Sequence, residues 1–413
     1  MTPEEAERYV LSRELFGMRF GLDRMRRMMT ALGHPERKFE SVHVVGTNGK
    51  SSTTRMIAAI LSWHGLLTGA YLSPHLVSFG ERIRIGDRDL ERSAFAAAVQ
   101  RAARAAELVE HSLPPEDRVT QFELLTAAAY SELARRDVDV AVIEAGLGGR
   151  YDATNVIPSK VQVLTSVGLE HTRWLGPTIG AIAAEKLDVV REGATLVLGD
   201  GVHPEASAVA EAVAAERGVR LIRAPADPGV ALGAPGAFQR RNFALARTAA
   251  EVFLGELDEA AVAAAAASVR VPGRLQIVDD DPLVLLDGAH NPEGTAALTE
   301  SLPEIVGARR PVVGVISILD DKDAAAMLRT LLPECDAVIF TSSQNPRALP
   351  PPTLLSLAGQ LGGPPAEIVP GAHAAVLRAR ELAGASGAVV VSGSIYLIAD
   401  VLQPTARHRA SML

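Results

Sequence analysis

Short apolar runs and longer segments with helical spacing alternate along much of the chain. Three runs rich in β-branched residues are each followed by such a segment, at 41–45, 138–144 and 161–167. After Lys50, four apolar residues fall on one face of a helix that Gly65 would end: Met56, Ile57, Ile60 and Leu61. Strands that alternate with helices predict an α/β fold whose parallel sheet is covered on both faces.

The pattern loosens between residues 201 and 270 and then starts again. The looser region is rich in alanine, so we predict helices around a loop that contains Pro and Gly. At RVPGRLQ, residues 270–276, Pro and Gly interrupt the helical pattern, and five apolar runs follow, at 283–287, 311–317, 337–340, 366–369 and 388–394. We predict two domains: a doubly wound, mainly parallel sheet over 1–271 and a smaller Rossmann-like α/β domain over 272–413.

Composition narrows the class of protein. With 413 residues and 48% hydrophobic content, the chain can bury two cores. No run reaches the roughly 18 consecutive apolar residues of a membrane span, and the acidic start MTPEEAERYV lacks the basic and apolar regions of a signal peptide. Cys335 is the only cysteine, which excludes an intramolecular disulfide and a thiolate zinc site. A net charge of −8 argues against a broad nucleic-acid surface, so we expect a soluble cytoplasmic protein that binds neither nucleic acid nor membranes.

The stretch VVGTNGKSSTT, from Val44 to Thr54, joins a strand to a helix. It fits the last three positions of the phosphate-loop pattern G-x-x-x-x-G-K-[ST] and carries Val44 in place of the first glycine. Backbone N–H groups of such a turn can wrap an oligophosphate, a lysine can neutralise the β/γ oxygens, and a serine hydroxyl can reach Mg²⁺. The alternative is an ordinary turn in which Ser51 caps the helix. The candidate nucleotide-binding residues are Gly46, Thr47, Asn48, Gly49, Lys50, Ser51 and Ser52.

Two further strand ends carry candidate metal ligands. Glu144 ends an apolar strand in VIEAGLGGRYDATN, whose glycines would let the backbone approach a ligand closely. His171 follows the strand that ends near Val167, and Lys186 lies on a helix that starts near Thr178. The alternative for Glu144 is a solvated glutamate, and the alternative for His171 is a structural histidine. Donors at successive strand ends nevertheless favour a common site.

The segment SPHLVSFGERIRI, residues 73–85, offers groups for an anionic substrate. Ser73 and His75 belong to a loop made rigid by proline, and Arg82 adds positive charge. Arg84 alternates with isoleucines, which favours a half-exposed strand for this residue.

The segment LVLLDGAHNPEG, residues 283–294, leaves a strand and enters a helix. Asp287 can accept a hydrogen bond there from an amine or a ribose hydroxyl, and His290 follows it closely. Asn291 fits the helix N-cap, and we keep it outside the candidate site. The acidic run 279–281 is interpreted as a solvated turn.

Seven segments stand in this order along the chain: GTNGKSS, SPHLVSFGERI, FELLTAAAY, EAGLGGRYDATN, LEHTRWLG, PGRLQ and LDGAHNP. Together they resemble the folylpolyglutamate synthase/dihydrofolate synthase family of the Mur-ligase superfamily, and the resemblance continues to SGSIYLI at 392–398. The superfamily has a compact G-T-x-G-K loop, which accounts for Val44. Two positions depart from the folate branch, where a glycine stands at Ser51 and an asparagine at Gly80.

The resemblance implies an ATP-dependent ligase. In the family's reaction a carboxylate attacks the γ-phosphate of ATP to give an acyl phosphate, and the amine of L-glutamate then displaces phosphate. The implied ligands are ATP, Mg²⁺ at two sites, L-glutamate, and dihydropteroate or reduced folates. A monomer is the implied state, and closure of the two domains around ATP would exclude water. Dihydrofolate synthesis, polyglutamate extension or both remain open.

By the same resemblance, roles carry over residue by residue. The implied metal ligands are Ser73, Glu144, His171 and Ser51, with Ser52 as the alternative to Ser51. Lys186 resembles the lysine that the family carbamylates. Further implied nucleotide contacts are Asn242, Arg274 and Asp287, and the implied substrate contacts are Ser73, His75, Arg82 and Ser394. The candidate catalytic residues are Lys50, Lys186, His171, Asp287 and His290.

Two other functions share parts of this pattern. A cell-wall Mur ligase, acting on a UDP-muramoyl substrate, has the same loop, but only about 40 residues precede the loop here, too few for a UDP-sugar domain. A nucleotide-binding paralogue without catalysis is the other alternative. We would expect such a paralogue to have lost Glu144, His171 or Lys186, and all three are present.

Overall fold

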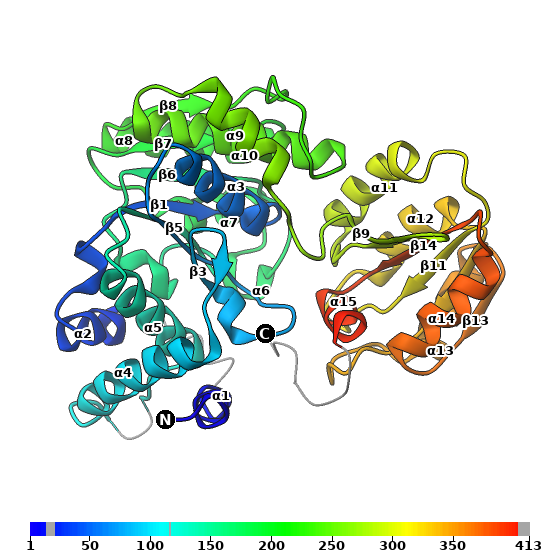
Figure 1. Cartoon of the computed structure of the whole chain (residues 1–413), viewed down its shortest axis with the longest axis horizontal. Helices are drawn as coiled ribbons and strands as arrows, with labels where there is room; N and C mark the ends of the chain where they lie inside the picture. The colour runs from blue at the N-terminus through cyan, green and yellow to red at the C-terminus, as the bar shows by residue number, and fades with distance from the viewer. Residues whose placement is uncertain (14–20, 115–116, 404–413) are drawn as a thin grey trace.

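The computed structural model of the protein describes residues 1–13, 21–114 and 117–403. The described chain forms two lobes, each built on its own sheet (Figure 1). The first lobe runs from α1 to α10 and the second lobe from β9 to α15.

The sheet of the first lobe has the strand order β4-β3-β2-β5-β1-β6-β7-β8. Neighbouring strands are parallel except in the β2–β3 and β3–β4 pairs. The strands are β1 (Glu40–Val45), β2 (Thr68–Tyr71), β3 (Ile83–Ile85), β4 (Arg88–Asp89), β5 (Val140–Glu144), β6 (Val161–Leu164), β7 (Thr195–Leu198) and β8 (Arg220–Arg223). The helices are α1 (Pro3–Leu11), α2 (Asp23–Ala31), α3 (Lys50–Trp63), α4 (Arg92–Glu110), α5 (Gln121–Arg135), α6 (Thr172–Leu175), α7 (Ile179–Leu187), α8 (Pro204–Arg217), α9 (Ala237–Leu254) and α10 (Glu259–Ser268).

Helices cover both faces of this sheet. Along β5, Val142 packs with Met56 of α3 in one apolar cluster, whereas its neighbour Ile143 packs with Leu124 of α5 in another. Successive side chains of a strand point to opposite faces, so a strand buried on both faces must be apolar at every position. This arrangement confirms the doubly wound, mainly parallel fold expected from the sequence.

The second lobe is smaller, with the strand order β13-β12-β11-β14-β10-β9 and only β9 antiparallel to its neighbour. Its strands are β9 (Gln276–Asp280), β10 (Leu283–Leu286), β11 (Val312–Ile316), β12 (Ala337–Phe340), β13 (Ala366–Ile368) and β14 (Ala388–Ser392). Its helices are α11 (Pro292–Val306), α12 (Ala324–Leu331), α13 (Pro351–Gln360), α14 (Ala372–Ala383) and α15 (Ile395–Leu402). The Rossmann-like α/β character of this part of the chain is confirmed.

Three details differ from the sequence expectations. The alanine-rich region contains an edge strand, β8, which was missed because its pattern RLIR is short and no residue in it is fully buried. The acidic run is also not simply a turn, since Asp279 and Asp280 end β9. The third difference is that several strands stop one to three residues earlier than their apolar runs, as β6 does at Leu164.

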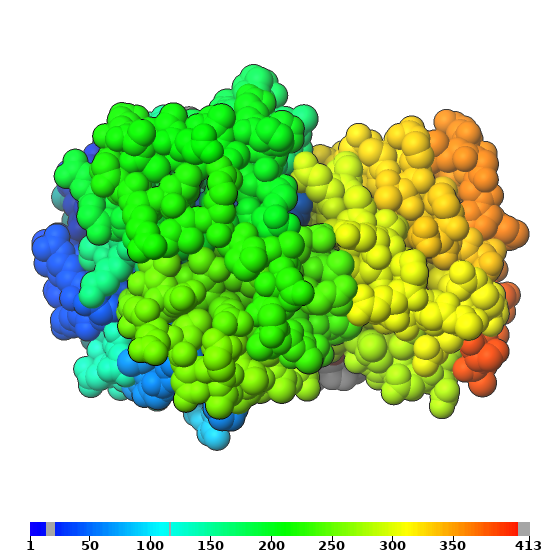
Figure 2. Space-filling view, turned by 90° about the horizontal axis from the view of Figure 1, so that it is seen from above, coloured from blue at the N-terminus to red at the C-terminus, as the bar shows by residue number. Residues whose placement is uncertain are grey.

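The two lobes meet along one face of each (Figure 2). The chain passes from α10 to β9 through residues 269–275. We propose that the lobes correspond to two domains, 1–271 and 272–413, of which residues 404–413 lie outside the described part. Among the described helices, none has the length and apolar character needed to cross a membrane.

Candidate active site

The turn between β1 and α3 is shaped by two glycines with positive φ. A Cβ on Gly46, at φ 152°, would lie 1.9 Å from Oγ1 of Thr165, and one on Gly49, at φ 85°, would lie 2.7 Å from Oδ1 of Asn242. Gly49 is the helix N-cap and has no side chain to occupy the first N–H groups of α3. The alternative in which Ser51 caps the helix is therefore wrong. The open N–H groups at the start of α3 are free to bind an anion.

A second loop, which follows β6, holds this turn in place. The N–H of Thr47 donates to the carbonyl of Ser166 (2.8 Å), and the N–H of Asn48 donates to the Ser166 hydroxyl (2.9 Å). The hydroxyl of Thr165 donates to the carbonyl of Asn48 (2.7 Å). Sequence reasoning missed Thr165 and Ser166, although their polar side chains directly follow an apolar strand.

Two lysine side chains meet at the turn. Lys50 Nζ donates to the carbonyls of Gly46 (3.1 Å) and Thr47 (3.0 Å), and Lys186 Nζ donates to the same Gly46 carbonyl (2.8 Å). Burial, and after it the charge of Lys50, lowers the pKa of Lys186 to about 7. The structure thus brings together two predicted catalytic residues, one of which is neutral in a large fraction of molecules at pH 7.

Glu144 links the turn to the segment that follows β2. Its carboxylate accepts from the Ser51 hydroxyl (2.8 Å) and from the N–H of Ser73 (3.1 Å). Burial raises the pKa of the Glu144 carboxyl, while the nearby charge of Lys50 acts in the opposite direction. Three of the four predicted metal ligands therefore lie side by side.

Ser73, His75 and Arg82 form a buried group of their own. Arg82 donates from Nε to His75 Nδ1 (2.9 Å) and from Nη1 to the Ser73 hydroxyl (3.1 Å). Because arginine can only donate, Nδ1 of His75 is an acceptor and the proton of the neutral ring sits on Nε2. Burial and the charge of Arg82 hold the pKa of His75 well below its usual range. Arg82 is 1% exposed, so in this structure its guanidinium contacts side chains of the protein itself.

His171 occupies the N-cap of α6 with a left-handed backbone, φ 53°. Burial lowers its pKa to about 4, although Glu170 acts in the opposite direction. The ring is neutral at pH 7 and can offer a lone pair to a metal. Among the hydrogen bonds of the described residues, none joins His171 to Glu144 or Ser73, so its place in a common metal site stays a prediction.

The glycines after Glu144 have a packing role. A Cβ on Gly149 would lie 2.3 Å from the carbonyl oxygen of Lys186, and one on Gly146 would lie 2.5 Å from the ring of Phe122. These glycines let the turn pack closely on α7 and α5, which fixes Lys186 relative to Glu144. The structure shows that these glycines allow close approach of two protein segments, while close approach of the backbone to a ligand stays a prediction.

Glu170 joins the two lobes. Its carboxylate accepts from Lys322 Nζ (2.8 Å) and from Asn291 Nδ2 (3.0 Å), and it lies 3.4 Å from His290 Nε2. Burial raises the pKa of Glu170, but the hydrogen bond with His290 and the charge of Lys322 outweigh it and leave the pKa well below its usual range. Asn291 also exchanges two amide hydrogen bonds with Asn48 of the turn (3.0 and 3.3 Å).

The sequence pointed to only part of this contact. Asn291 is the predicted N-cap of α11, accepting from the N–H of Gly294 (2.7 Å), and its place between the lobes was not expected. Lys322 was not considered, and its partner Glu170 is 152 residues away in the chain. No local pattern could have found this pair.

The remaining candidates from the second half of the chain occupy the edge that faces the first lobe. Asp287 is buried and accepts from the N–H groups of Leu275 (2.9 Å) and Ala289 (2.8 Å), and burial raises its pKa. Arg274 Nη1 donates to the carbonyl of Gly273 (3.1 Å). Ser394 caps α15 through the N–H of Tyr396 (3.1 Å), which already explains this serine structurally.

Oxygen donors suited to a hard cation are present. In the described part of the chain no three His, Cys, Asp or Glu side chains converge to hold a metal ion by themselves. The Ser51 hydroxyl and the Glu144 carboxylate, however, stand 2.8 Å apart beside the nucleotide turn. Mg²⁺ typically takes one or two carboxylate or hydroxyl ligands and completes its shell with water and phosphate oxygens. These residues fit the implied Mg²⁺, although they do not form a closed metal cage.

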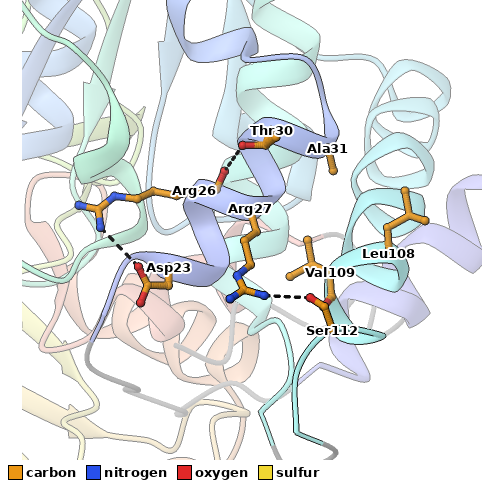
Figure 3. Close-up of a pocket in the computed structure, with 8 residues that line it drawn as sticks. All are labelled: Asp23, Arg26, Arg27, Thr30, Ala31, Leu108, Val109 and Ser112. Carbon is orange, nitrogen blue, oxygen red and sulfur yellow. Dashed lines mark hydrogen bonds and ion pairs between the residues drawn. The ribbon is translucent and has the colours of Figure 1, made fainter.

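An open hollow of about 680 Å³ lies elsewhere, between α2 and α4 (Figure 3). Two arginines line it, but Arg26 pairs with Asp23 (3.5 Å) and Arg27 donates to the Ser112 hydroxyl (2.9 Å). None of the predicted site residues lines this hollow. It is therefore not part of the candidate site.

Comparisons with known proteins agree with this geometry. The family model of the Mur ligase glutamate ligase domain matches residues 273–395. Over 431 residues the chain is 32% identical to the dihydrofolate synthase/folylpolyglutamate synthase of Bacillus subtilis, covering 96% of this chain and 98% of that protein. The chain belongs to the folylpolyglutamate synthase/dihydrofolate synthase family. This membership confirms the resemblance and the enzyme class, an ATP-dependent ligase.

Two solved structures are similar over nearly the whole chain. Mycobacterium tuberculosis folylpolyglutamate synthase complexed with ADP has a TM-score of 0.89 at 31% identity, with 96% of each chain covered. E. coli FolC in complex with DHPP and ADP has a TM-score of 0.87 at 30% identity, with 97% of each chain covered. Both lobes of the family fold are therefore present in this protein.

Proposed function

We propose that this protein forms the amide bond between L-glutamate and the carboxylate of a pteroate or folate, through an acyl phosphate made with ATP. The observation that carries the proposal is the group at the β1–α3 turn. There, Lys50 and Lys186 share one carbonyl, and Ser51 and Glu144 are hydrogen-bonded beside them. The relatives' structures support it, because one holds ADP and the other holds DHPP and ADP.

For the first step the protein must bind and orient ATP. The open start of α3 would receive phosphate oxygens, and Lys50 would turn from the two loop carbonyls to the β/γ phosphates. Asn242 lies against the turn, since the position of a Cβ on Gly49 is 2.7 Å from its Oδ1. We propose that Asn242 contacts the adenine and that Arg274 contacts the phosphates.

Ser51, Glu144, Ser73 and His171 would hold Mg²⁺ at two sites, with Ser52 as the alternative to Ser51. When bound, Mg²⁺ would neutralise phosphate charge as the γ-phosphoryl group moves to the substrate carboxylate. The neutral ring of His171 and the hydrogen bond between Ser51 and Glu144 support these assignments.

Lys186 fits the carbamylation that the family resemblance implies. Reaction of an amine with CO₂ requires the neutral form, and burial lowers the pKa of Lys186 to about 7. The product would be an anion in place of a cation. It would therefore relieve the repulsion between Lys186 and Lys50.

For the second step the second lobe would present L-glutamate. We propose that Asp287 and His290 contact the nucleotide and the glutamate, and that Ser394 contacts the glutamate carboxylate. His75, Arg82 and Ser73 would line the acceptor side. The interlobe contacts of Glu170 support a closed arrangement in which water is kept from the acyl phosphate.

The test is incubation with Mg·ATP and L-glutamate, offering dihydropteroate or a reduced folate, with ADP and product masses followed. Glutamate-dependent ADP release with a gain of one glutamate on dihydropteroate alone makes the protein a synthase. A gain on both acceptors makes it bifunctional. No gain on either, with ATP bound, would favour the muramoyl ligase or the non-catalytic paralogue. We also propose that it acts in the cytoplasm as a monomer on small molecules, which size-exclusion chromatography with light scattering can check for the oligomeric state.

A further inference from the structure

The segment from Ser73 to Arg82 belongs to the first lobe and lies on the side that faces the second lobe (Figure 1). Leu76 is 6% exposed, and every other buried member of its apolar cluster comes from residues 284–399. A Cβ on Gly273 would lie 3.3 Å from Leu76 and 3.2 Å from Ile398 of α15. Leu76 is therefore a side chain of the first lobe buried in the core of the second.

The segment is too well bonded internally to absorb a movement of Leu76. The carboxylate of Glu81 accepts from three successive N–H groups, those of Leu76 (2.8 Å), Val77 (2.8 Å) and Ser78 (2.6 Å). Arg82 donates two further hydrogen bonds, one to His75 and one to Ser73, and so links these two residues. A displacement at Leu76 is thus transmitted along the segment to Ser73, three residues away.

Ser73 is also a partner of Glu144. Its N–H donates to one carboxylate oxygen (3.1 Å), while the hydroxyl of Ser51 donates to the other (2.8 Å). Glu144 is 1% exposed and can gain little help from water, so these two donors fix its orientation. The contacts run without a gap from the core of the second lobe to the carboxylate beside the nucleotide turn.

We propose that Leu76 is a positioning residue, through which the second lobe orients Glu144 for metal and phosphate. The role of Leu76 in the reaction rests on the proposed function, whereas the coupling of the second lobe to Glu144 does not. When the second lobe holds Leu76, Ser73 and Glu144 are in place. When it moves away, the carboxylate loses one of its two donors, so ATP is turned over efficiently only when both lobes are assembled.

Leu76→Ala, Leu76→Met and Leu354→Ala test this proposal. Leu354, on α13, is fully buried in the cluster on the other face of the second sheet, so its truncation is a matched cavity control. The readouts are thermal unfolding, Mg²⁺ affinity by calorimetry in the presence of a non-hydrolysable ATP analogue, and kcat. We expect Leu76→Ala to weaken Mg²⁺ binding and kcat by about 10- to 100-fold, because outer contacts of metal ligands have effects of that size. Nucleotide binding without Mg²⁺ should stay within about twofold of the wild type, and Leu76→Met should restore both readouts.

Equal effects of Leu76→Ala and Leu354→Ala at equal loss of stability would overturn the proposal, as would an unchanged Mg²⁺ affinity. If Leu76→Ala does not fold, Leu76→Val makes a smaller cavity and replaces it, against Leu354→Val. Failure of the proposed function is a separate result: the wild type then releases no ADP in response to glutamate with any acceptor. The Mg²⁺ measurement still decides the role of Leu76 in that case.

Discussion

Two turns carry a strand into a helix at the site, and they treat the start of the helix differently. After β1, Gly49 caps α3 without a side chain, and the amino groups of Lys50 and Lys186 meet at the turn. After β10, the side chain of Asn291 caps α11, and Asp287 accepts two backbone N–H groups. The first turn is open to an anion, whereas the second has satisfied its own donors. A helix start binds phosphate only where the protein leaves its N–H groups free.

The largest effect on activity is expected from removing the cation Lys50 of the open turn. Lys50→Met should lower kcat/KM for ATP by about 10³-fold, since the loss of one preorganised group that stabilises transition-state charge has this order of effect. The control is Lys38→Met, an exposed lysine, which should leave the rate unchanged. Steady-state ADP release decides between them. A loss of less than tenfold would contradict the phosphate role of Lys50.

The second largest effect is expected from breaking the ion pair between Glu170, in the loop after β6, and Lys322, between β11 and α12, which joins the two lobes. The side chains of Lys322 and Glu170 are each 10% exposed, so Lys322→Met leaves a buried carboxylate without its lysine, with Asn291 and His290 as its remaining partners. Breaking such a pair costs about 3 kcal/mol, and we expect kcat/KM to fall by about 10²-fold. The double variant Glu170→Gln with Lys322→Met should recover much of this loss. Additive losses in this double-mutant cycle would show that the two side chains act separately.

The pH dependence of activity tests the second lysine of the open turn, Lys186. The pKa of Lys186 is lowered to about 7, so at a pH below this value the side chain is mostly an ammonium, which cannot react with CO₂. After equilibration with bicarbonate, activity should fall about tenfold between pH 8 and pH 6, following the fraction of neutral amine. Intact-protein mass at the two pH values, preserving the carbamate, provides a direct check. A flat profile together with an unmodified Lys186 would contradict the carbamylation.

Lys186 also makes a prediction for stability. The folded pKa, about 7, is below the ordinary value of 10.5, so the unfolded chain binds more protons between these values and stability rises with pH there. Below about pH 7 the full cost of the buried ammonium is present. Lys186→Met should therefore unfold at a higher temperature than the wild type at pH 6, and this difference should shrink toward pH 10. Scanning calorimetry at both values would reveal the opposite trend if the lysine were stabilising.

The smallest effect is expected at the self-capped turn. Asn291→Ala removes the cap of α11, which costs about 1 kcal/mol of stability, and it also removes the amide pair with Asn48. Asn291→Ser keeps a capping oxygen but cannot donate to Glu170 as the amide does. Denaturant unfolding should therefore separate the two variants, with the alanine less stable, while both raise the KM for ATP or glutamate. Equal stabilities would mean that the cap contributes nothing measurable.

How much was predictable differs between these regions. The phosphate turn and Glu144 were predicted from residue types at strand ends, because the carboxyl ends of parallel strands share one edge. Lys186 lies on a helix, and its role was predicted from the family resemblance. The cradle of Thr165 and Ser166 was missed, since its contacts with Asn48 span 117 and 118 residues. For Arg82, the charge was noticed but its burial was not. The strand β8 was missed because an exposed edge strand lacks the strong apolar pattern of a central one.

By itself, the sequence determined the alternation of strands and helices, the order of the motifs and the chemistry available at each strand end. These depend on local periodicity and on residue type, which are written along the chain. Only the tertiary structure decided which of these groups meet: two lysines on one carbonyl, Glu170 against Lys322, and Leu76 in the core of the other lobe. Such contacts join residues far apart in sequence, and their geometry depends on how whole elements pack, which no local pattern specifies.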